Sequence, residues 1–298
     1  MKRRDFIMLF GGAAAWPLPL FWPFAARAQT RPAPGQPATG QVGAGQAGEV
    51  GQVSTVAGSA TVTRGNAAPV PLQVGDAILK NDALATGPAA TLGVTFDDET
   101  TFSLSPNTRI VVTEFVYQQG GSANAAVFGV LVGTAAFVAS QVAKTGDMKI
   151  TTPVATLGIR GTTGVVDVPQ GGGAGEEPRI KLYADSDGHV GQIQVFNVQG
   201  GQLGVLTQGA SAFALRPGAG GRFQAVPFQI PASEVARDRG VLQRLFASHT
   251  VGRRMTIQRL RLRGQNRGRG RPGRQQFNHN PRGGQPPHRT NQNGRQRR

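Results

Sequence analysis

The sequence predicts an all-β fold, a sandwich- or solenoid-like stack of short strands, with one short C-terminal helix and disordered ends. The main observation is that β-branched and aromatic runs alternate with turn signals roughly every 8–12 residues between residues 49 and 228. That stretch is long enough to bury a hydrophobic core. The chain contains no cysteine, so the fold must depend on this core without disulfides.

Turn signals divide residues 49–228 into successive strands. Gly75-Asp76 follows the first β-rich runs, and Ser105-Pro106-Asn107 separates two later ones. Asp185-Ser186-Asp187-Gly188 fits a hairpin turn better than a calcium loop, because the full set of ligand positions is missing. The β-rich runs are 53–62, 69–74, 77–84, 91–96, 100–104, 108–117, 127–132, 134–138, 148–152, 165–168, 179–183, 190–198, 202–206 and 211–215.

A short helix is predicted over residues 229–250. Ser233 can cap it, and apolar side chains follow at helical spacing despite Gly240. We expect these side chains to pack on the β body; the alternative is a helix that binds a partner or a membrane surface. The apolar stripe consists of Val235, Val241, Leu242, Leu245 and Phe246.

Residues 1–28 have the layout of an export signal. A basic segment at residues 2–4 precedes an apolar run at residues 6–24, and Ala26-Arg27-Ala28 fits a cleavage site. An uncleaved membrane anchor is the alternative, although prolines interrupt the apolar run. Residues 29–48 are mostly Pro, Gly, Gln and Ala, and we expect them to form a disordered linker.

The export route is indicated by the pair Arg3-Arg4. This pair stands before Phe6-Ile7, an order typical of the twin-arginine signal that exports folded proteins. Lys2 and Met8 depart from that pattern, which leaves general secretion as the alternative. By either route, we expect the mature protein in the periplasm or secreted.

The positive charge lies at the C-terminus. The formal net charge is +16, and residues 253–298 contribute 14 arginines and no acidic residue, whereas residues 31–252 are close to neutral. We predict that residues 251–298 form a disordered Arg/Gly-rich basic tail.

Such a tail suits binding to polyanions by charge and by guanidinium hydrogen bonds. Outside the cytoplasm these are lipid headgroups at an anionic membrane surface, lipopolysaccharide or stray nucleic acid. We expect no sequence-specific nucleic-acid binding, because nothing positions side chains against base edges. The alternative is a solubilising extension without a specific partner. The candidate polyanion-binding residues are Arg253, Arg254, Arg259, Arg261, Arg263, Arg267, Arg269, Arg271 and Arg274.

Residues suited to catalysis or metal binding are sparse. The four histidines lack metal-ligand spacing, and no serine lies in a G-x-S-x-G context. Asp97-Asp98-Glu99 is the best candidate for acid–base chemistry, but adjacent acids in a tight turn usually face solvent. The sequence therefore predicts a protein that is not an enzyme, with no catalytic residue, metal site or cofactor.

One segment carries a recognisable motif. Residues Ile150 to Thr162 read ITTPVATLGIRGT. The glycine turn at 158–164 leads into a strand and not into a helix, so we interpret its glycines as residues that allow positive φ angles; an anion-binding loop is the alternative. With LQVGD at 72–76 and VTFDDETTFSL at 94–104, the segment resembles the FecR-like domain, whose hallmark is V-x-T-P-x-A-x-x-x-x-R-G-T. The signature residues here are Thr152, Pro153, Gly158, Arg160, Gly161 and Thr162.

The resemblance implies an all-β module of the bacterial cell envelope, which we place at residues 49–228. In the family's namesake, this module relays a signal from an outer-membrane receptor to a sigma factor. An export signal and a linker precede the module here, so we do not expect sigma regulation. We predict an exported, non-enzymatic FecR-like interaction or scaffold module that binds an envelope protein or polysaccharide through its β domain. The alternative is a polyanion-binding protein that acts mainly through its basic tail.

Overall fold

The computed structural model describes residues 48–171 and 176–269, except for the side chains of Ala219 and of residues 263–269. The predicted signal peptide at residues 1–28 lies outside the described residues, as does the linker up to residue 47. Within the described ranges, 17 strands and one long helix make a mainly β fold, which confirms the predicted fold class.

The strands form two hydrogen-bonded ladders that share strand β9. Sheet A has the order β4 (Ala77–Leu79), β1 (Glu49–Ala57), β6 (Thr91–Phe96), β7 (Thr101–Leu104), β9 (Ala125–Val138), β12 (Thr163–Val168), β13 (Arg179–Tyr183), β16 (Ser211–Pro217) and β17 (Phe223–Pro227). Sheet B has the order β3 (Val70–Pro71), β2 (Ala60–Arg64), β5 (Asp82–Thr86), β8 (Arg109–Val116), β9, β10 (Asp147–Thr151), β11 (Ala155–Arg160), β14 (Gln192–Asn197) and β15 (Gln202–Leu206). Every pairing is antiparallel except that of β9 with β10.

Strand β9 crosses from one layer to the other at Gly133. Its first half pairs with β8 and β10 in sheet B, and its second half pairs with β7 and β12 in sheet A. Gly133 has a φ of +92°, and a Cβ there would lie 2.4 Å from the Thr108 hydroxyl oxygen. Only glycine fits this crossing, because it tolerates both the left-handed backbone and the close contact.

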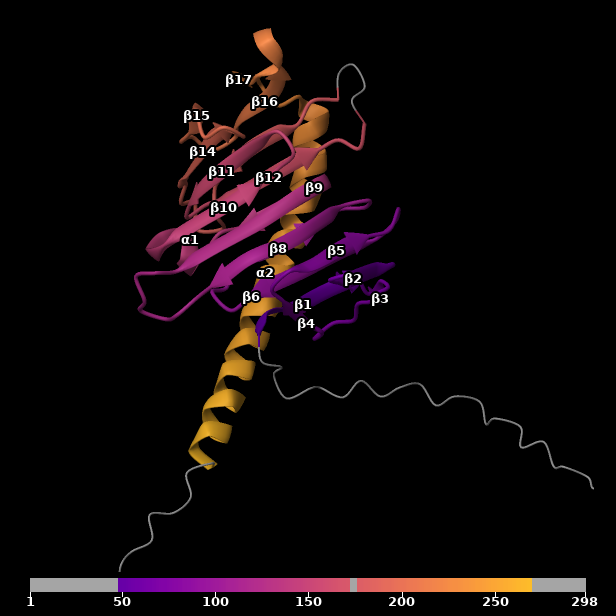
Figure 1. Cartoon of the computed structure of the whole chain (residues 1–298), viewed down its shortest axis with the longest axis vertical. Helices are drawn as coiled ribbons and strands as arrows, with labels where there is room; N and C mark the ends of the chain where they lie inside the picture. The colour runs from indigo at the N-terminus through magenta and orange to yellow at the C-terminus, as the bar shows by residue number, and fades with distance from the viewer. Residues whose placement is uncertain (1–47, 172–175, 270–298) are drawn as a thin grey trace, which may run out of the picture. The chain divides into compact units, whose positions relative to one another are not determined.

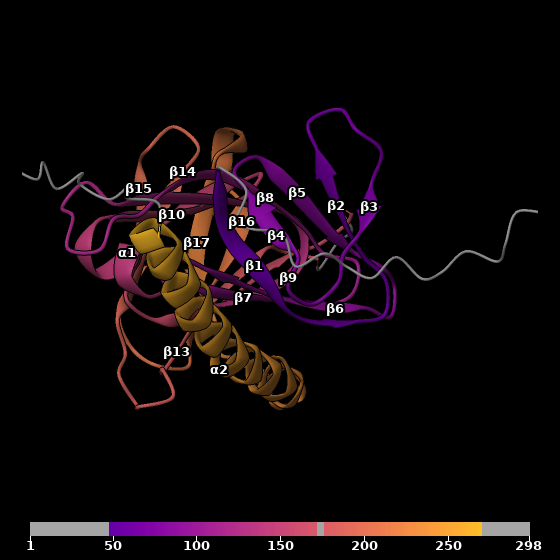
Figure 2. The same cartoon turned by 90° about the horizontal axis from the view of Figure 1, so that it is seen from below.

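The hydrophobic core lies between the two layers of strands. Figure 2 shows these layers from below. Phenylalanines pack at the centre of the core, with the ring centroids of Phe96 and Phe128 4.8 Å apart and those of Phe102 and Phe128 4.7 Å apart. These side chains are fully buried, as are most inward residues of the alternating strands. The predicted alternation of strands and turns therefore produces one shared core.

The three helical elements are α1 (Gln141–Thr145), the 3-10 helix η1 (Ala219–Gly221) and α2 (Ala232–Arg269). Helix α2 contacts β1, β6, β7 and β9 on the outer face of sheet A, and Figure 1 shows it running alongside the stack of strands. No helix in the described ranges is both long and apolar enough to cross a membrane. The prediction of a short helix ending at residue 250 was wrong, and so was the prediction of a disordered tail from residue 251 to residue 269; residues 270–298 lie outside the described residues.

The distal part of α2 packs through small and polar residues. Ser248 shares a 2.7 Å hydrogen bond with Thr55, and the Gln52 amide donates to Thr256 across 3.3 Å. At Gly252, between them, a Cβ would lie 1.8 Å from the Thr95 hydroxyl oxygen. These inward residues have helical spacing but little hydrophobicity, so the apolar pattern in the sequence ends before the helix does.

Candidate functional site

Thr152 and Pro153 of the signature lie in the turn between β10 and β11. The Thr152 hydroxyl oxygen accepts hydrogen bonds from the backbone N–H groups of Ala155, at 3.0 Å, and Val154, at 3.4 Å. The same hydroxyl lies 3.0 Å from the Ala155 carbonyl oxygen, to which it can donate. This local pattern is a side-chain-stabilised turn, so these two residues fix the start of β11.

The Arg-Gly-Thr part of the signature carries the chain from sheet B to sheet A. Arg160 ends β11, and Gly161, with a φ of +47°, turns the backbone towards β12. The buried Thr162 hydroxyl donates to the Tyr183 carbonyl oxygen across 3.3 Å. Gly158, which we predicted in the turn, lies within β11.

Arg160 itself is exposed. Its guanidinium donates a 2.7 Å hydrogen bond to the Gly146 carbonyl oxygen, which ties β11 to the end of α1. The side chain therefore has one backbone partner and free donors that face solvent. Because the side chain is exposed, it does not form a buried ion pair.

Glycine is required at two points of this crossing, for different reasons. Replacing Gly161 by alanine should cost about 1 kcal/mol, because its backbone is left-handed. Replacing Gly164 by alanine should cost about 1–3 kcal/mol, because its Cβ would lie 2.5 Å from the buried Phe137 ring. Gly209→Ala is the control, since its Cβ would make ordinary contacts. Urea denaturation measures all three, and equal midpoints would show that the crossing tolerates side chains.

A polar pocket lies beside the crossing. It has a volume of about 570 Å³ and brings the signature residues Arg160 and Gly161 next to charged side chains of both signs. The Thr163 hydroxyl donates a hydrogen bond to the Asp185 carboxylate across 2.6 Å, and the backbone N–H of His189 donates one to the Asp187 carboxylate across 3.0 Å. Among the described residues, no group of three or more His, Cys, Asp or Glu side chains is arranged to hold a metal ion. The other lining residues are Ala143, Lys144, Asp185, Asp187 and His189.

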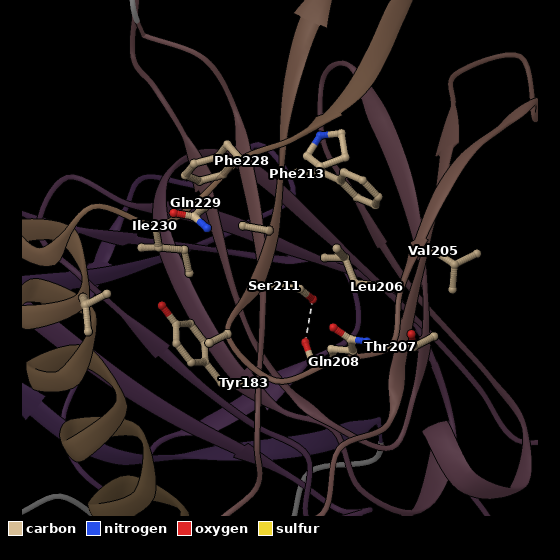
Figure 3. Close-up of a pocket in the computed structure, with 14 residues that line it drawn as sticks. Tyr183, Val205, Leu206, Thr207, Gln208, Ser211, Phe213, Phe228, Gln229 and Ile230 are labelled. Carbon is tan, nitrogen blue, oxygen red and sulfur yellow. Dashed lines mark hydrogen bonds between the residues drawn. The ribbon is translucent and has the colours of Figure 1, made fainter.

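An apolar groove of about 560 Å³ lies at the end of the sandwich formed by β15, β16 and β17. Figure 3 shows Phe213, Phe228 and Ile230 on one side of the groove and Thr207 and Gln208 on the other. Leu206 and Phe213 are buried at its base, whereas Phe228 and Ile230 are partly exposed. The groove thus offers an apolar surface with a few polar groups at its rim, a composition typical of binding sites.

Two strand edges flank this groove. Among the described residues, β15 pairs only with β14, and β17 pairs only with β16, so the outer edge of each strand has no strand partner. An edge strand of this kind can accept a further extended segment through main-chain hydrogen bonds. The sequence did not predict the groove, because its walls come from segments that meet only after both sheets have formed.

A buried ionic cluster fastens the start of α2 to sheet A. The fully buried Lys181 ammonium lies 2.6 Å from Glu234, 2.7 Å from Asp167 and 2.8 Å from Asp238. The Tyr183 hydroxyl also donates to Asp238, across 2.7 Å. Sequence reasoning missed this cluster, because Lys181 stands among apolar residues of a strand.

Electrostatics explain why this cluster stays charged. Burial lowers the pKa of Lys181, but the three carboxylates outweigh this effect and raise the pKa above its usual value. Burial also raises the pKa of Glu234, yet hydrogen bonds and charge from Lys181 and Arg179 lower it overall. Burial and the bond to Asp238 raise the pKa of Tyr183, so its hydroxyl remains a donor. The arrangement is suited to holding two elements together.

The acidic turn 97–99 does not face solvent as a whole. Asp98 is fully buried, accepts hydrogen bonds from the backbone N–H groups of Thr100 and Val142, at 2.9 Å and 3.1 Å, and accepts a third from the Thr100 hydroxyl. Burial raises its pKa, although these bonds oppose the shift. The expectation of solvent-facing acids was therefore wrong for Asp98, which links the β6–β7 turn to α1.

The predicted polyanion-binding arginines have different surroundings. Arg253 pairs with Glu99 at 2.9 Å, and Arg259 is largely buried against Glu49 and Asp97. Acidic residues of the β body thus pair with both arginines, and binding of polyanions by Arg253 and Arg259 stays a prediction. Arg254 and Arg261 are exposed. The side chains of Arg263, Arg267 and Arg269, and all of Arg271 and Arg274, lie outside the described part of the chain.

Comparison with known proteins gives limited similarity. A family model described as "FecR protein" matches residues 82–176. Two crystal structures of candidate anti-sigma factors from Parabacteroides distasonis ATCC 8503 are similar in part. The structure at 2.50 Å resolution has 14% identity and a TM-score of 0.36, over 52% of this chain and 62% of that chain. The structure at 1.65 Å resolution has 13% identity and a TM-score of 0.35, over 54% of this chain and 74% of that chain.

This chain thus spans less than two thirds of the first of those proteins. No curated protein matches it. The matched stretch runs from the start of β5 past β12, and it includes the complete signature from Thr152 to Thr162. The resemblance predicted from the sequence is confirmed over this stretch, whereas the wider bounds 49–228 stay a prediction. Residues 82–176 are therefore similar to the family described as "FecR protein".

Proposed function

We propose that this protein is an exported, non-enzymatic module of the bacterial cell envelope that binds an extended apolar segment of an envelope protein. The observation that supports this most strongly is the apolar groove next to the free edge of β15. Main-chain hydrogen bonds to such an edge supply affinity, and a neighbouring pocket selects the side chain. A polysaccharide fits the site less well, because it cannot pair with the main chain of a strand edge as an extended peptide does.

The proposal is tested by recovering partners from the envelope fraction with matched variants. Ile230→Asp places a charge in the partly exposed wall of the groove, and Val74→Asp makes the same kind of change at an exposed site outside it. We expect Ile230→Asp to lose the partner and Val74→Asp to retain it. Retention by both variants would contradict the assignment of the groove.

A truncation separates the groove from the basic C-terminus. The chain should end after Leu262 and not at Gly252, because α2 packs on sheet A as far as Arg259. We expect the truncated protein to recover the same partner. Loss of the partner on truncation alone would place recognition in the C-terminal residues.

Export is tested separately. Replacing both Arg3 and Arg4 with lysine should block translocation, because the twin-arginine pathway requires the arginine pair. The measurement is the distribution of full-length and processed protein between cytoplasm and periplasm, with Arg27→Lys as a control near the cleavage site. Normal export of the variant that carries both Arg3→Lys and Arg4→Lys would exclude the twin-arginine route and leave general secretion.

A second candidate function, polyanion binding, is favoured by unpaired cations on α2. Arg254 and Arg261 are exposed, and among the described residues they make no ion pair. Residues 263–298 add ten arginines and no acidic residue. This function is independent of the groove and is tested by salt-dependent retention on heparin.

A further inference from the structure

We propose that the outward face of the distal part of α2, residues 251–262, binds an anionic lipid surface. This inference rests on the second candidate function and names its ligand. It requires three features together: unpaired positive charge, exposed apolar side chains beside the charges, and a fixed orientation of the helix. The described residues of α2 provide all three.

The orientation of the helix is fixed by its inner face. Gly252 approaches Thr95 too closely for any side chain, and Arg259 pairs with Glu49 and Asp97 of the β body. At about 100° per residue, Arg261 lies roughly 180° around the helix from Gly252. The distal part of α2 is therefore held with one defined face turned away from sheet A.

That outward face carries free positive charge. Arg254 and Arg261 are exposed, and neither has an ion pair or a hydrogen bond to another described residue. They lie seven residues apart, two helical turns, so their Cα atoms are roughly 10 Å apart on the same side. Phosphate groups of neighbouring lipids can approach both guanidinium groups at once.

Apolar side chains stand beside these arginines: at about 100° per residue, Ile257 lies roughly 40–60° from them around the helix, and Leu260 and Leu262 lie on opposite flanks, each about 100° from Arg261. Ile257, Leu260 and Leu262 are 41%, 47% and 56% exposed. Burying them would stabilise contact with a bilayer, where cationic residues meet headgroups and apolar residues enter the boundary with the acyl chains. A site for a soluble polyanion gains nothing from such exposed aliphatic residues.

Nucleic acid fits this face less well. Residues 251–262 contain no aromatic side chain on which a base can stack. The following residues, 263–298, contribute ten arginines without an acid, which extends the attraction to any anionic surface that α2 approaches. The exposed apolar residues of α2 favour an anionic lipid surface over nucleic acid as the ligand.

The test measures co-sedimentation of the mature full-length protein with vesicles. One set contains equal parts phosphatidylcholine and phosphatidylglycerol, and the other contains phosphatidylcholine alone. Arg254→Gln with Arg261→Gln should weaken partitioning into the anionic vesicles about 30-fold, since each basic residue contributes on the order of 1 kcal/mol. Ile257→Ser with Leu260→Ser should weaken it at least about tenfold.

Arg239→Gln with Arg244→Gln is the matched control, because it removes the same charge from the proximal part of the same helix. We expect the control to change partitioning less than about threefold, since the distal site lies beyond the Debye length. All six positions are exposed, and far-UV circular dichroism verifies that each variant keeps its helix.

Heparin retention distinguishes failure of this inference from failure of polyanion binding. If the Ile257/Leu260 variant binds anionic vesicles like the wild type, the lipid inference is wrong, while salt-sensitive retention on heparin would still support a general polyanion site. If neither vesicles nor heparin retain the protein, both fail. If Arg254→Gln with Arg261→Gln leaves the vesicle binding of the full-length protein unchanged, the C-terminal residues carry the binding and the role of α2 is overturned.

Discussion

Replacing Leu157 with aspartate is expected to unfold the β-sandwich. Leu157 is fully buried in β11, where it lies opposite Ile150 of β10 and Val195 of β14. An unpaired carboxylate at this position loses its hydration and finds no counter-charge. The expected loss of unfolding free energy is about 4 kcal/mol or more, a large part of the stability of a typical domain.

The measurement is thermal melting followed by near-UV circular dichroism. Leu131→Asp is the matched control, because Leu131 is 44% exposed on β9 and the chemical change is identical. We expect Leu131→Asp to melt within a few degrees of the wild type and Leu157→Asp to lose its near-UV signal at room temperature. Equal melting of the two variants would contradict the position of β11 in the core.

Replacing Lys181 with methionine should have the second-largest effect. The substitution removes the only ammonium group that contacts Asp167, Glu234 and Asp238 together among the described residues. Breaking a buried ion pair by removing one partner costs about 3–5 kcal/mol, because the remaining charges stay buried without compensation. The loss should appear first as detachment of the start of α2 from β13.

Urea denaturation and amide exchange of α2 measure this effect. Lys149→Met is the matched control, since Lys149 pairs with Asp147 at 2.6 Å but is 47% exposed, and an exposed pair contributes about 0–1 kcal/mol. Adding Asp238→Asn to Lys181→Met should restore part of the stability, because it removes one uncompensated charge. A Lys181 variant as stable as the Lys149 variant would show that the cluster does not hold the helix.

The same cluster predicts how stability depends on pH. The pKa of Glu234 is lowered in the folded state, so its contribution is complete above its ordinary value of 4.5 and is lost as pH falls through the lowered value. The pKa of Lys181 is raised, so its contribution is complete below its ordinary value of 10.5 and is lost as pH rises through the raised value. Docking of α2 should therefore be stable through neutral pH and weaken at both extremes.

The sequence predicted the strands well, because half-buried strands alternate apolar and polar residues locally. In the signature, Leu157 and Ile159 alternate with Gly158 and Arg160, and both apolar side chains are fully buried. The sequence did not predict that β9 belongs to both sheets or that β9 and β10 pair in parallel. Pairing partners far apart in the chain leave no local pattern to read.

Helix α2 was predicted from the sequence only in part. Its apolar stripe predicted a helix only to residue 250, although Val241 and Leu245 are buried as expected. The remaining contacts depend on Ser248, Gly252 and Arg259, whose partners lie on β1, β6 and the β6–β7 turn. Such contacts form only when sheet A is assembled, so they leave no pattern in the sequence. Because of them, residues 251–269 belong to helix α2 and not to a disordered tail.

The most direct test of the proposed function is site-specific photo-crosslinking in the exporting cell. A photoreactive phenylalanine analogue replaces Phe228 in the groove, and in a parallel strain it replaces the exposed Val74 outside the groove. We expect one abundant adduct with an envelope protein from position 228, absent from position 74 and absent when Ile230→Asp is added. An adduct from position 74 but not from position 228 would contradict the proposed function.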